Sequence, residues 1–411
     1  MNTHFTPEFF AGNRARLRQL LNSDIPIVVT GNGLMQRGAD ESFRFHQDSN
    51  FWYLTGLDAP DLVLVMTTRE AYLLVPGRSA ERAAFDGEHD AAAYSARSGI
   101  ATVVPAKEGW RRTQRDLQDT VATLLAPPSH LKQHGLYTLP FRRNLIAKLK
   151  RLRPGLQLQD IRMDLAACRS LKQPQELAAL QQAIDITCDT LSSVTTKASL
   201  QAMRYEYELE AAISQGFRSQ GADGHAFAPI VGAGKHGTTL HYLDNNGPLA
   251  PQDLIVLDVG ASVEHYSADI TRTVAKQSFS SRQLAVFEAV CAVQDYALSL
   301  LKPGVNLFDY EEQVTSRMGE HLHGLGLLDA PTKQAIRRYY PHGTSHFLGL
   351  DTHDVGNYRQ PLASGMVLTC EPGIYIPEEG IGVRIEDDVL ITNTGCKVLS
   401  AACPRLLTPV Q

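Results

Sequence analysis

The chain has 411 residues, of which 43% are hydrophobic and 20% are charged, and its formal net charge is −5. This length exceeds what one ordinary core holds and predicts two domains of a soluble globular protein. There is no basic surplus to neutralise phosphates and no apolar run near the ~20 residues that cross a bilayer, so we expect neither a nucleic-acid partner nor a membrane.

The six cysteines lie apart from one another in apolar surroundings, and none forms a Cys-x-x-Cys pair. Such a pattern is typical of reduced, buried thiols. The first residues lack a basic segment followed by an apolar one, so we expect no secretory signal. We therefore predict a cytoplasmic protein.

The N-terminal part of the chain alternates apolar, β-branched segments with charged, alanine-containing ones. Strands that alternate with helices in this way favour a layered α/β domain. Helices are predicted over residues 8–21, 80–96, 113–125 and 142–152, and strands over residues 25–30, 62–66, 71–75 and 102–104.

A break at Arg153-Pro-Gly155 precedes a helix start at Pro174 and Glu176. We place the domain boundary within residues 165–172 and divide the chain into residues 1–168 and 169–411. A helix is predicted from Pro174 onwards, because apolar residues recur there every three or four positions. Two more are predicted over residues 205–220, ending at Gly221, and over residues 281–301, ending at Lys302-Pro-Gly304. Apolar, β-branched segments lie between and after them. The second domain is therefore predicted to be a sheet backed by helices, and the chain to be of the α+β class.

Five residues of the second domain form a hard, oxygen-rich ligand set: Asp258, Asp269, His346, Glu371 and Glu386. Each carboxylate interrupts an apolar, β-rich segment, where a charge is costly unless it is paired, hydrogen-bonded or bound to metal. Four such carboxylates in one core would repel one another, and two cations would remove that repulsion. The set therefore predicts two divalent metal ions that share bridging carboxylates.

The motifs around these residues resemble those of the pita-bread metallopeptidases, in particular aminopeptidase P and prolidase. They are Leu240-His-Tyr242, Leu257-Asp-Val-Gly260, Ala268-Asp-Ile-Thr-Arg-Thr273, His342-Gly-Thr-Ser-His346, Leu348-Gly-Leu-Asp-Thr-His-Asp354, Glu371-Pro-Gly-Ile-Tyr375 and Gly382-Val-Arg-Ile-Glu-Asp-Asp388. In the first domain, Phe45-His-Gln-Asp-Ser-Asn-Phe-Trp-Tyr-Leu-Thr-Gly56 is similar to the signature of the aminopeptidase P N-terminal domain. The resemblance implies a C-terminal pita-bread (creatinase/aminopeptidase) catalytic domain and an N-terminal creatinase-like α/β domain that serves oligomerisation and substrate access.

The resemblance also implies a role for each of the five ligands. Asp258 would hold one metal ion, and Asp269 and Glu386 would bridge both ions. His346 and Glu371 would hold the other ion. Glu371 would also carry a proton from the attacking water to the leaving proline nitrogen. The cofactor would be two divalent ions, manganese by family expectation, with zinc or cobalt as alternatives.

Four further residues are implied in the same way. His241 and His353 match the two non-ligand histidines of the family's site and would hold the substrate carbonyl and stabilise the tetrahedral intermediate. Arg384 lies two residues before Glu386, so strand alternation places both on one face, where Arg384 would anchor a ligand or orient a carboxylate. Tyr375 has the same parity as Glu371 and is expected next to the site, where it would bind substrate.

The implied activity is hydrolysis of the Xaa-Pro bond, which releases the first residue of peptides with proline in second position. An Xaa-Pro dipeptidase with the same site is the alternative, since the segment between Tyr375 and Gly382 is shorter than in many aminopeptidase P relatives and would alter how much peptide the cleft accepts. A creatinase-type hydrolase without metal and a non-catalytic peptide-binding relative are disfavoured, because all five ligands are present. Relatives assemble through the N-terminal domain, so a homodimer or homotetramer is expected.

Overall fold

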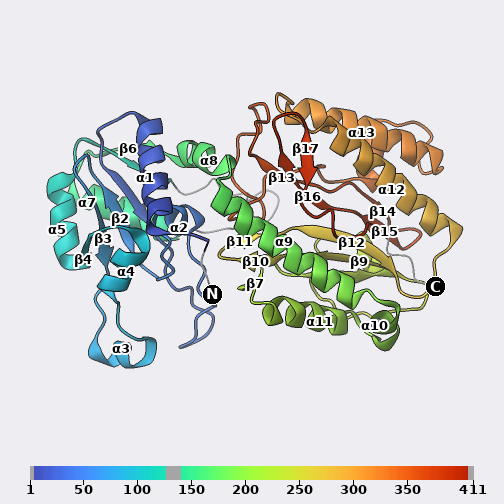
Figure 1. Cartoon of the computed structure of the whole chain (residues 1–411), viewed down its shortest axis with the longest axis horizontal. Coiled ribbons are helices and arrows are strands. Elements are labelled where there is room, and N and C mark those ends of the chain that lie inside the picture. Colours follow the sequence, from blue (N-terminus) through green and yellow to red (C-terminus); the bar gives the residue numbers. More distant parts are fainter. Residues whose placement is uncertain (1–3, 126–139, 406–411) are drawn as a thin grey trace. The chain divides into compact units, whose positions relative to one another are not determined.

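The computed structural model describes residues 4–125 and 140–405. It divides into two compact units, Met1–Cys168 and Arg169–Gln411 (Figure 1). Each unit contains both helices and sheet, in agreement with the α+β class expected from the sequence.

The first unit is built on a six-stranded mixed sheet with the order β4-β3-β2-β1-β5-β6. Neighbours β1, β2 and β3 are antiparallel, and the pairs β3–β4, β1–β5 and β5–β6 are parallel. The strands are β1 Ile27–Thr30, β2 Val63–Met66, β3 Ala71–Val75, β4 Thr102–Pro105, β5 Thr120–Thr123 and β6 Gln157–Asp160. The helices are α1 Pro7–Leu21, α2 Ser49–Thr55, α3 Ala80–Asp86, α4 Ala91–Ser98, α5 Ala106–Asp116, α7 Pro140–Leu152 and α8 Arg162–Ser170, which ends just past the boundary.

Two helix predictions for this unit are wrong. The helix predicted over residues 80–96 is two helices, since Gly87 ends α3 with a φ of 73° and Asp90 caps the start of α4. The helix predicted over residues 113–125 starts and ends earlier, as α5, and the β-branched residues 120–123 form strand β5. A Cβ at Gly109, inside α5, would lie 2.3 Å from Cγ of Leu74 on β3. Glycine thus lets α5 pack closely on the sheet.

The second unit contains three three-stranded sheets and one hairpin among its described residues, and all of their strand pairs are antiparallel. The sheet orders are β11-β10-β7, β12-β9-β8 and β13-β16-β17, and β14 pairs with β15. The strands are β7 Gly224–His225, β8 Ile230–Ala233, β9 Leu254–Val259, β10 Ala261–Val263, β11 Tyr266–Ser267, β12 Ile270–Ala275, β13 Val367–Cys370, β14 Gly373–Ile376, β15 Ile381–Arg384, β16 Asp387–Ile391 and β17 Cys396–Val398.

The helices of this unit confirm the three that the sequence predicts. They are α9 Pro174–Val194, α10 Lys197–Ala202, α11 Glu206–Ser219, α12 Ser281–Leu300, α13 Leu307–Gly324 and α14 Lys333–Tyr339, with a 3₁₀ turn η1 at Gly234–Thr238. Proline occupies the first turn of α9, and the Glu176 carboxylate accepts a hydrogen bond from the Gln173 backbone N–H at 2.9 Å.

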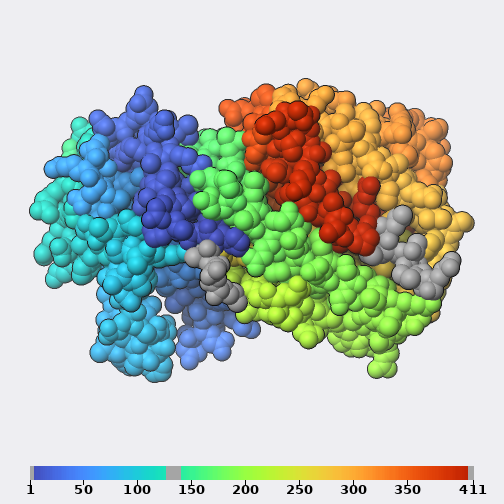
Figure 2. All heavy atoms as spheres, viewed as in Figure 1, coloured from blue at the N-terminus to red at the C-terminus, as the bar shows by residue number. Residues whose placement is uncertain are grey.

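Helices α12 and α13 bury apolar side chains such as Val290, Val293 and Met318 in one core with strand residues Leu368 and Val389. On the face shown in Figure 2, α9 (green) runs beside the C-terminal segment (red), where Gln181 donates a hydrogen bond to the carbonyl of Leu399. Within residues 4–125 and 140–405, no helix combines the length and the apolar character needed to span a membrane.

Candidate active site

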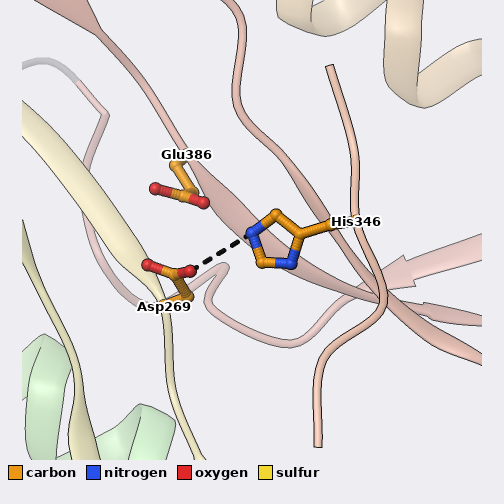
Figure 3. A group of neighbouring side chains, drawn as sticks. All are labelled: Asp269, His346 and Glu386. Carbon is orange, nitrogen blue, oxygen red and sulfur yellow. Dashed lines mark ion pairs between the residues drawn. The ribbon is translucent and has the colours of Figure 1, made fainter. Parts of the chain in front are cut away.

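Three of the predicted metal ligands converge where the sheets of the second unit meet. Asp269 lies just before β12, Glu386 lies between β15 and β16, and His346 lies in the segment before β13. One potential ligand atom from each lies within 4.8 Å of the others. Figure 3 shows the three side chains pointing toward one another, with Nε2 of His346 3.4 Å from a carboxylate oxygen of Asp269.

A backbone carbonyl orients the imidazole of His346 on the side away from Asp269. Its Nδ1 hydrogen-bonds to the carbonyl oxygen of Phe347 at 3.0 Å, so Nδ1 carries the proton. The lone pair of Nε2 therefore faces Asp269 and Glu371, whose nearest oxygens lie at 3.4 and 3.3 Å. A backbone carbonyl that fixes the tautomer in this way is a common partner of metal-binding histidines.

The other two predicted ligands complete the group. Asp258 lies on β9 opposite Thr271 of β12, and one of its buried oxygens, Oδ1, has no hydrogen-bond partner among the described residues. Glu371 follows β13 and is held by its backbone N–H, which donates to the carbonyl of Thr344 at 2.8 Å. Glu386 accepts a hydrogen bond from the hydroxyl of Thr271 at 2.6 Å. The structure thus brings all five predicted residues together.

Burial makes this group of carboxyls hard to ionise without a cation. It raises the pKa of Glu371 to about 7 and raises those of Asp269 and Glu386 well above their ordinary range, and neighbouring carboxylates add to each shift. Divalent cations would hold these groups ionised, and the unpartnered Oδ1 of Asp258 offers a further ligand atom. Four carboxylates and one imidazole therefore fit hard divalent cations.

A cavity of about 590 Å³ opens onto this group. Eight of the nine residues predicted for the site line this cavity; the ninth is Tyr375. The apolar wall of the cavity consists of Phe227, Ala228, Ile230, Leu240 and Leu243. His241 and His353, predicted to contact the substrate, thus lie in the same cavity as the ligands. The rings of His353 and His346 are 4.2 Å apart.

Arg384 orients a carboxylate, one of the two roles expected for it. It lies at the end of β15, is 4% exposed, and donates to Oδ2 of Asp258 and to the hydroxyl of Thr271 at 3.0 Å. It also donates to the hydroxyl of Tyr375 at 2.8 Å. Tyr375 does not line the cavity, contrary to the substrate-binding role expected for it, and instead lies behind the cavity and supports Arg384.

His342 lines the same cavity and was missed by reasoning from the sequence. Its Nε2 is 2.9 Å from the hydroxyl of Tyr375, and its Nδ1 is 3.7 Å from a carboxylate oxygen of Glu371. Burial lowers the pKa of His342 to about 3 and that of His353 to about 4, so both rings are neutral at pH 7. The one available signal was the short spacing between His342 and the predicted ligand His346 in a single motif.

The turn between β14 and β15 does not line the cavity, contrary to the expectation that its short length would shape the rim. Its two glutamates point elsewhere, since Glu378 pairs with Arg338 and Glu379 pairs with Arg282. The shortness of this turn therefore gives no argument for a dipeptidase.

Comparison with known proteins matches both units. Residues 178–393 match the model of metallopeptidase family M24, and residues 10–124 match the aminopeptidase P N-terminal domain. Xaa-Pro aminopeptidase of Haemophilus influenzae is 31% identical, over 98% of this chain and 96% of that protein. Mouse Xaa-Pro aminopeptidase 3 is also 31% identical, over 95% of this chain and 80% of its own length.

Solved structures give the same result for the fold. Aminopeptidase P of Escherichia coli with the inhibitor Pro-Leu, and its zinc-substituted form in complex with product, each match with a TM-score of 0.85. In both cases the identity is 28%, over 98% of this chain and 97% of the other. The second unit therefore has the pita-bread fold and the first has the N-terminal fold of aminopeptidase P. The chain belongs to metallopeptidase family M24, in its aminopeptidase P branch, and is a metallo-exopeptidase.

Proposed function

We propose that the chain is a dinuclear-metal Xaa-Pro aminopeptidase, which releases the first residue of peptides with proline in second position. The observation that supports this most is the convergence of five ligands and three histidines on one cavity. The similarity to Xaa-Pro aminopeptidases over nearly the whole chain supports it further.

In this proposal, Asp258 would hold one ion, His346 and Glu371 would hold the other, and Asp269 and Glu386 would hold both. Two bound divalent ions would polarise the scissile carbonyl and lower the pKa of a water molecule. We propose manganese as the native metal; the zinc-substituted E. coli relative makes zinc an alternative, and the hard ligand set also permits cobalt.

The protein's own residues would carry the proton and orient the substrate. Glu371 would take a proton from the attacking water and pass it to the proline nitrogen. His241 and His353 would donate hydrogen bonds to the substrate carbonyl as its oxygen gains charge. Arg384 would keep Asp258 in place.

Proline explains why a dedicated enzyme is needed. An Xaa-Pro bond has no N–H, so a peptidase that binds extended substrate through that group fails on it. A cavity that activates water and accepts the ring does not depend on the missing N–H.

Two matched tripeptides test the function. We expect Arg-Pro-Pro to be cleaved after arginine and Arg-Ala-Pro to be left largely intact, as followed by mass spectrometry of the products. Equal cleavage of both peptides would contradict the specificity for proline.

We further propose that residues 1–168 serve assembly and substrate access, so that the protein is a homodimer or homotetramer. Sedimentation equilibrium would show a species of two or four chains, and a monomer would contradict this. The six free cysteines are the reason for proposing a cytoplasmic location.

A further inference from the structure

Glu206 is a buried carboxylate that lies outside the cavity. It is the first residue of α11 and is fully shielded from solvent. Its Oε1 accepts hydrogen bonds from the backbone N–H of Ala233 at 2.8 Å and from the imidazole of His236 at 2.9 Å. Its Oε2 accepts from the backbone N–H of Gly247 at 2.6 Å and from the hydroxyl of Tyr242 at 2.8 Å.

All four donors belong to one segment, residues 233–247, which carries His241 to the cavity wall. Between η1 and β9 this segment forms neither a helix nor a strand. The irregular part is therefore positioned by its contacts with other elements. Glu206 bonds Tyr242 and Gly247 in it, and also bonds Ala233 of β8 and His236 of η1 at its start.

The backbone is shaped for this contact. A Cβ at Gly247 would lie 2.9 Å from Oε2 of Glu206 and 2.6 Å from the His236 ring, so only glycine permits the approach. The rings of His236 and Tyr242 stack with centroids 4.4 Å apart. Since α11 starts at Glu206, the helix N-terminus also favours its negative charge.

His241 itself has no other support of this kind. Within the described ranges, no hydrogen-bond partner of its imidazole is found, and its side chain is exposed in the cavity. The next residue, Tyr242, is hydrogen-bonded to Glu206 through its hydroxyl. Fixing Tyr242 on one side of the backbone therefore fixes the direction in which His241 projects.

We propose that Glu206 is a positioning residue for the reaction, which holds the segment 233–247 so that the His241 imidazole meets the substrate carbonyl. This inference rests on the proposed function, because it assigns His241 a role in turnover. Glu206 does not touch substrate and acts through His241.

The central test is a double-mutant cycle of Glu206→Gln and His241→Ala on the Xaa-Pro substrate. Glutamine keeps the shape but turns an amide N–H₂ toward two of the four donors. We expect kcat of Glu206→Gln to fall about ten- to a hundredfold, the size of a misplacement of up to 1 Å, with KM and bound metal unchanged. In the His241→Ala background the same change would cause no further loss.

The matched control is Glu208→Gln, two residues along the same helix. Glu208 is half-buried and accepts hydrogen bonds from the backbone N–H groups of Arg204 and Tyr205, a helix cap that glutamine can also make. We expect it to turn over substrate like the unaltered enzyme. If Glu206→Gln fails to fold, Tyr242→Phe removes one of the four donors, and its smaller loss should likewise vanish in the His241→Ala background.

Two results would overturn the inference: unaltered turnover in Glu206→Gln, or a full additional loss in the His241→Ala background. The proposed function is checked separately. If the unaltered protein does not cleave Xaa-Pro bonds, that function fails, and positioning is then read from the NMR signal of the His241 imidazole, assigned by its loss in His241→Ala. A shift of that signal in Glu206→Gln but not in Glu208→Gln supports the inference, and an unchanged signal contradicts it.

Discussion

Asp269 and Glu386 are 5% and 2% exposed and lie close to Asp258 and Glu371, with Arg384 as the adjoining permanent cation. Buried carboxyls close to other carboxyls take up protons unless a cation is bound to them. The local chemistry therefore depends on whether divalent ions are present. Each side chain that would bridge two ions is predicted to matter for metal content as well as for turnover.

We expect Asp269→Ala and Glu386→Ala to abolish turnover and to lower bound metal, because each residue would bridge both ions. Metal analysis of the purified variants and a peptide assay would measure this. Glu320→Gln, which changes an exposed carboxylate on α13, is the control and should keep both properties. Near-normal metal content and turnover in either bridging variant would refute the ligand assignment.

His353→Ala is expected to keep its metal but to lose turnover about 10²–10³-fold, the effect of removing one transition-state hydrogen-bond donor. Metal analysis of the purified variant and the peptide assay would measure both properties. Loss of metal in this variant would make His353 a ligand instead.

The lowered pKa of His353 predicts a pH dependence of stability in the chelated protein. The pKa of His353 is about 4 in the folded chain and 6.5 in the unfolded chain. Between pH 4 and 6.5, His353 is therefore protonated in the unfolded chain and neutral in the folded chain. Stability from this group is thus present above pH 6.5 and is lost as the pH falls toward 4. Urea unfolding at pH 7.5 and 4.5 should show a smaller loss in His353→Asn than in the unaltered protein, and equal losses would contradict the shift.

At the scale of elements, a buried ionic cluster holds the segment that carries His346 and His353. Asp354 accepts hydrogen bonds from Arg169 and, at 2.9 Å, from Lys172. Burial acts to raise the pKa of Asp354, and these two cations outweigh it, so the pKa lies below its ordinary value. The start of the second unit is thereby tied to the segment that carries His346 and His353.

Breaking this cluster from one side should be costly. Asp354→Asn leaves buried cations without their charge partner and is expected to lower the free energy of unfolding by about 3–5 kcal/mol. Asp351 also pairs with Arg169, but the side chain of Asp351 is 41% exposed. Asp351→Asn should therefore lower the free energy of unfolding by at most about 1 kcal/mol. Denaturant unfolding of both variants tests this, and similar losses would contradict it.

Local signals explain which elements the sequence could predict. Helices α9, α11 and α12 have an apolar face and a recognisable start, and both are properties of neighbouring residues. The close packing of α5 depends instead on how Gly109 meets Leu74 in the folded sheet. The metal ligands were predicted from their residue types, their apolar surroundings and the family motifs. In contrast, the bond from Arg384 to Asp258 joins residues 126 positions apart, and the place of His342 depends on Tyr375. Such contacts exist only once the sheets have packed.

At the scale of the molecule, the two units differ in what they supply. The second unit holds the cavity and every residue to which a catalytic role is assigned here. The first unit carries the aminopeptidase P N-terminal domain, and its proposed role is in assembly and access. The central claim therefore concerns one cavity and its metals.

The most direct test of that claim is a cleavage assay on Gly-Pro and Arg-Pro-Pro, with manganese, after chelation, and after manganese is restored. We predict release of arginine from the tripeptide, its loss on chelation and its return with manganese. Cleavage of the dipeptide alone would make the protein an Xaa-Pro dipeptidase. Tripeptide cleavage that survives complete removal of metal, or no turnover of either peptide with metal bound, would contradict the account.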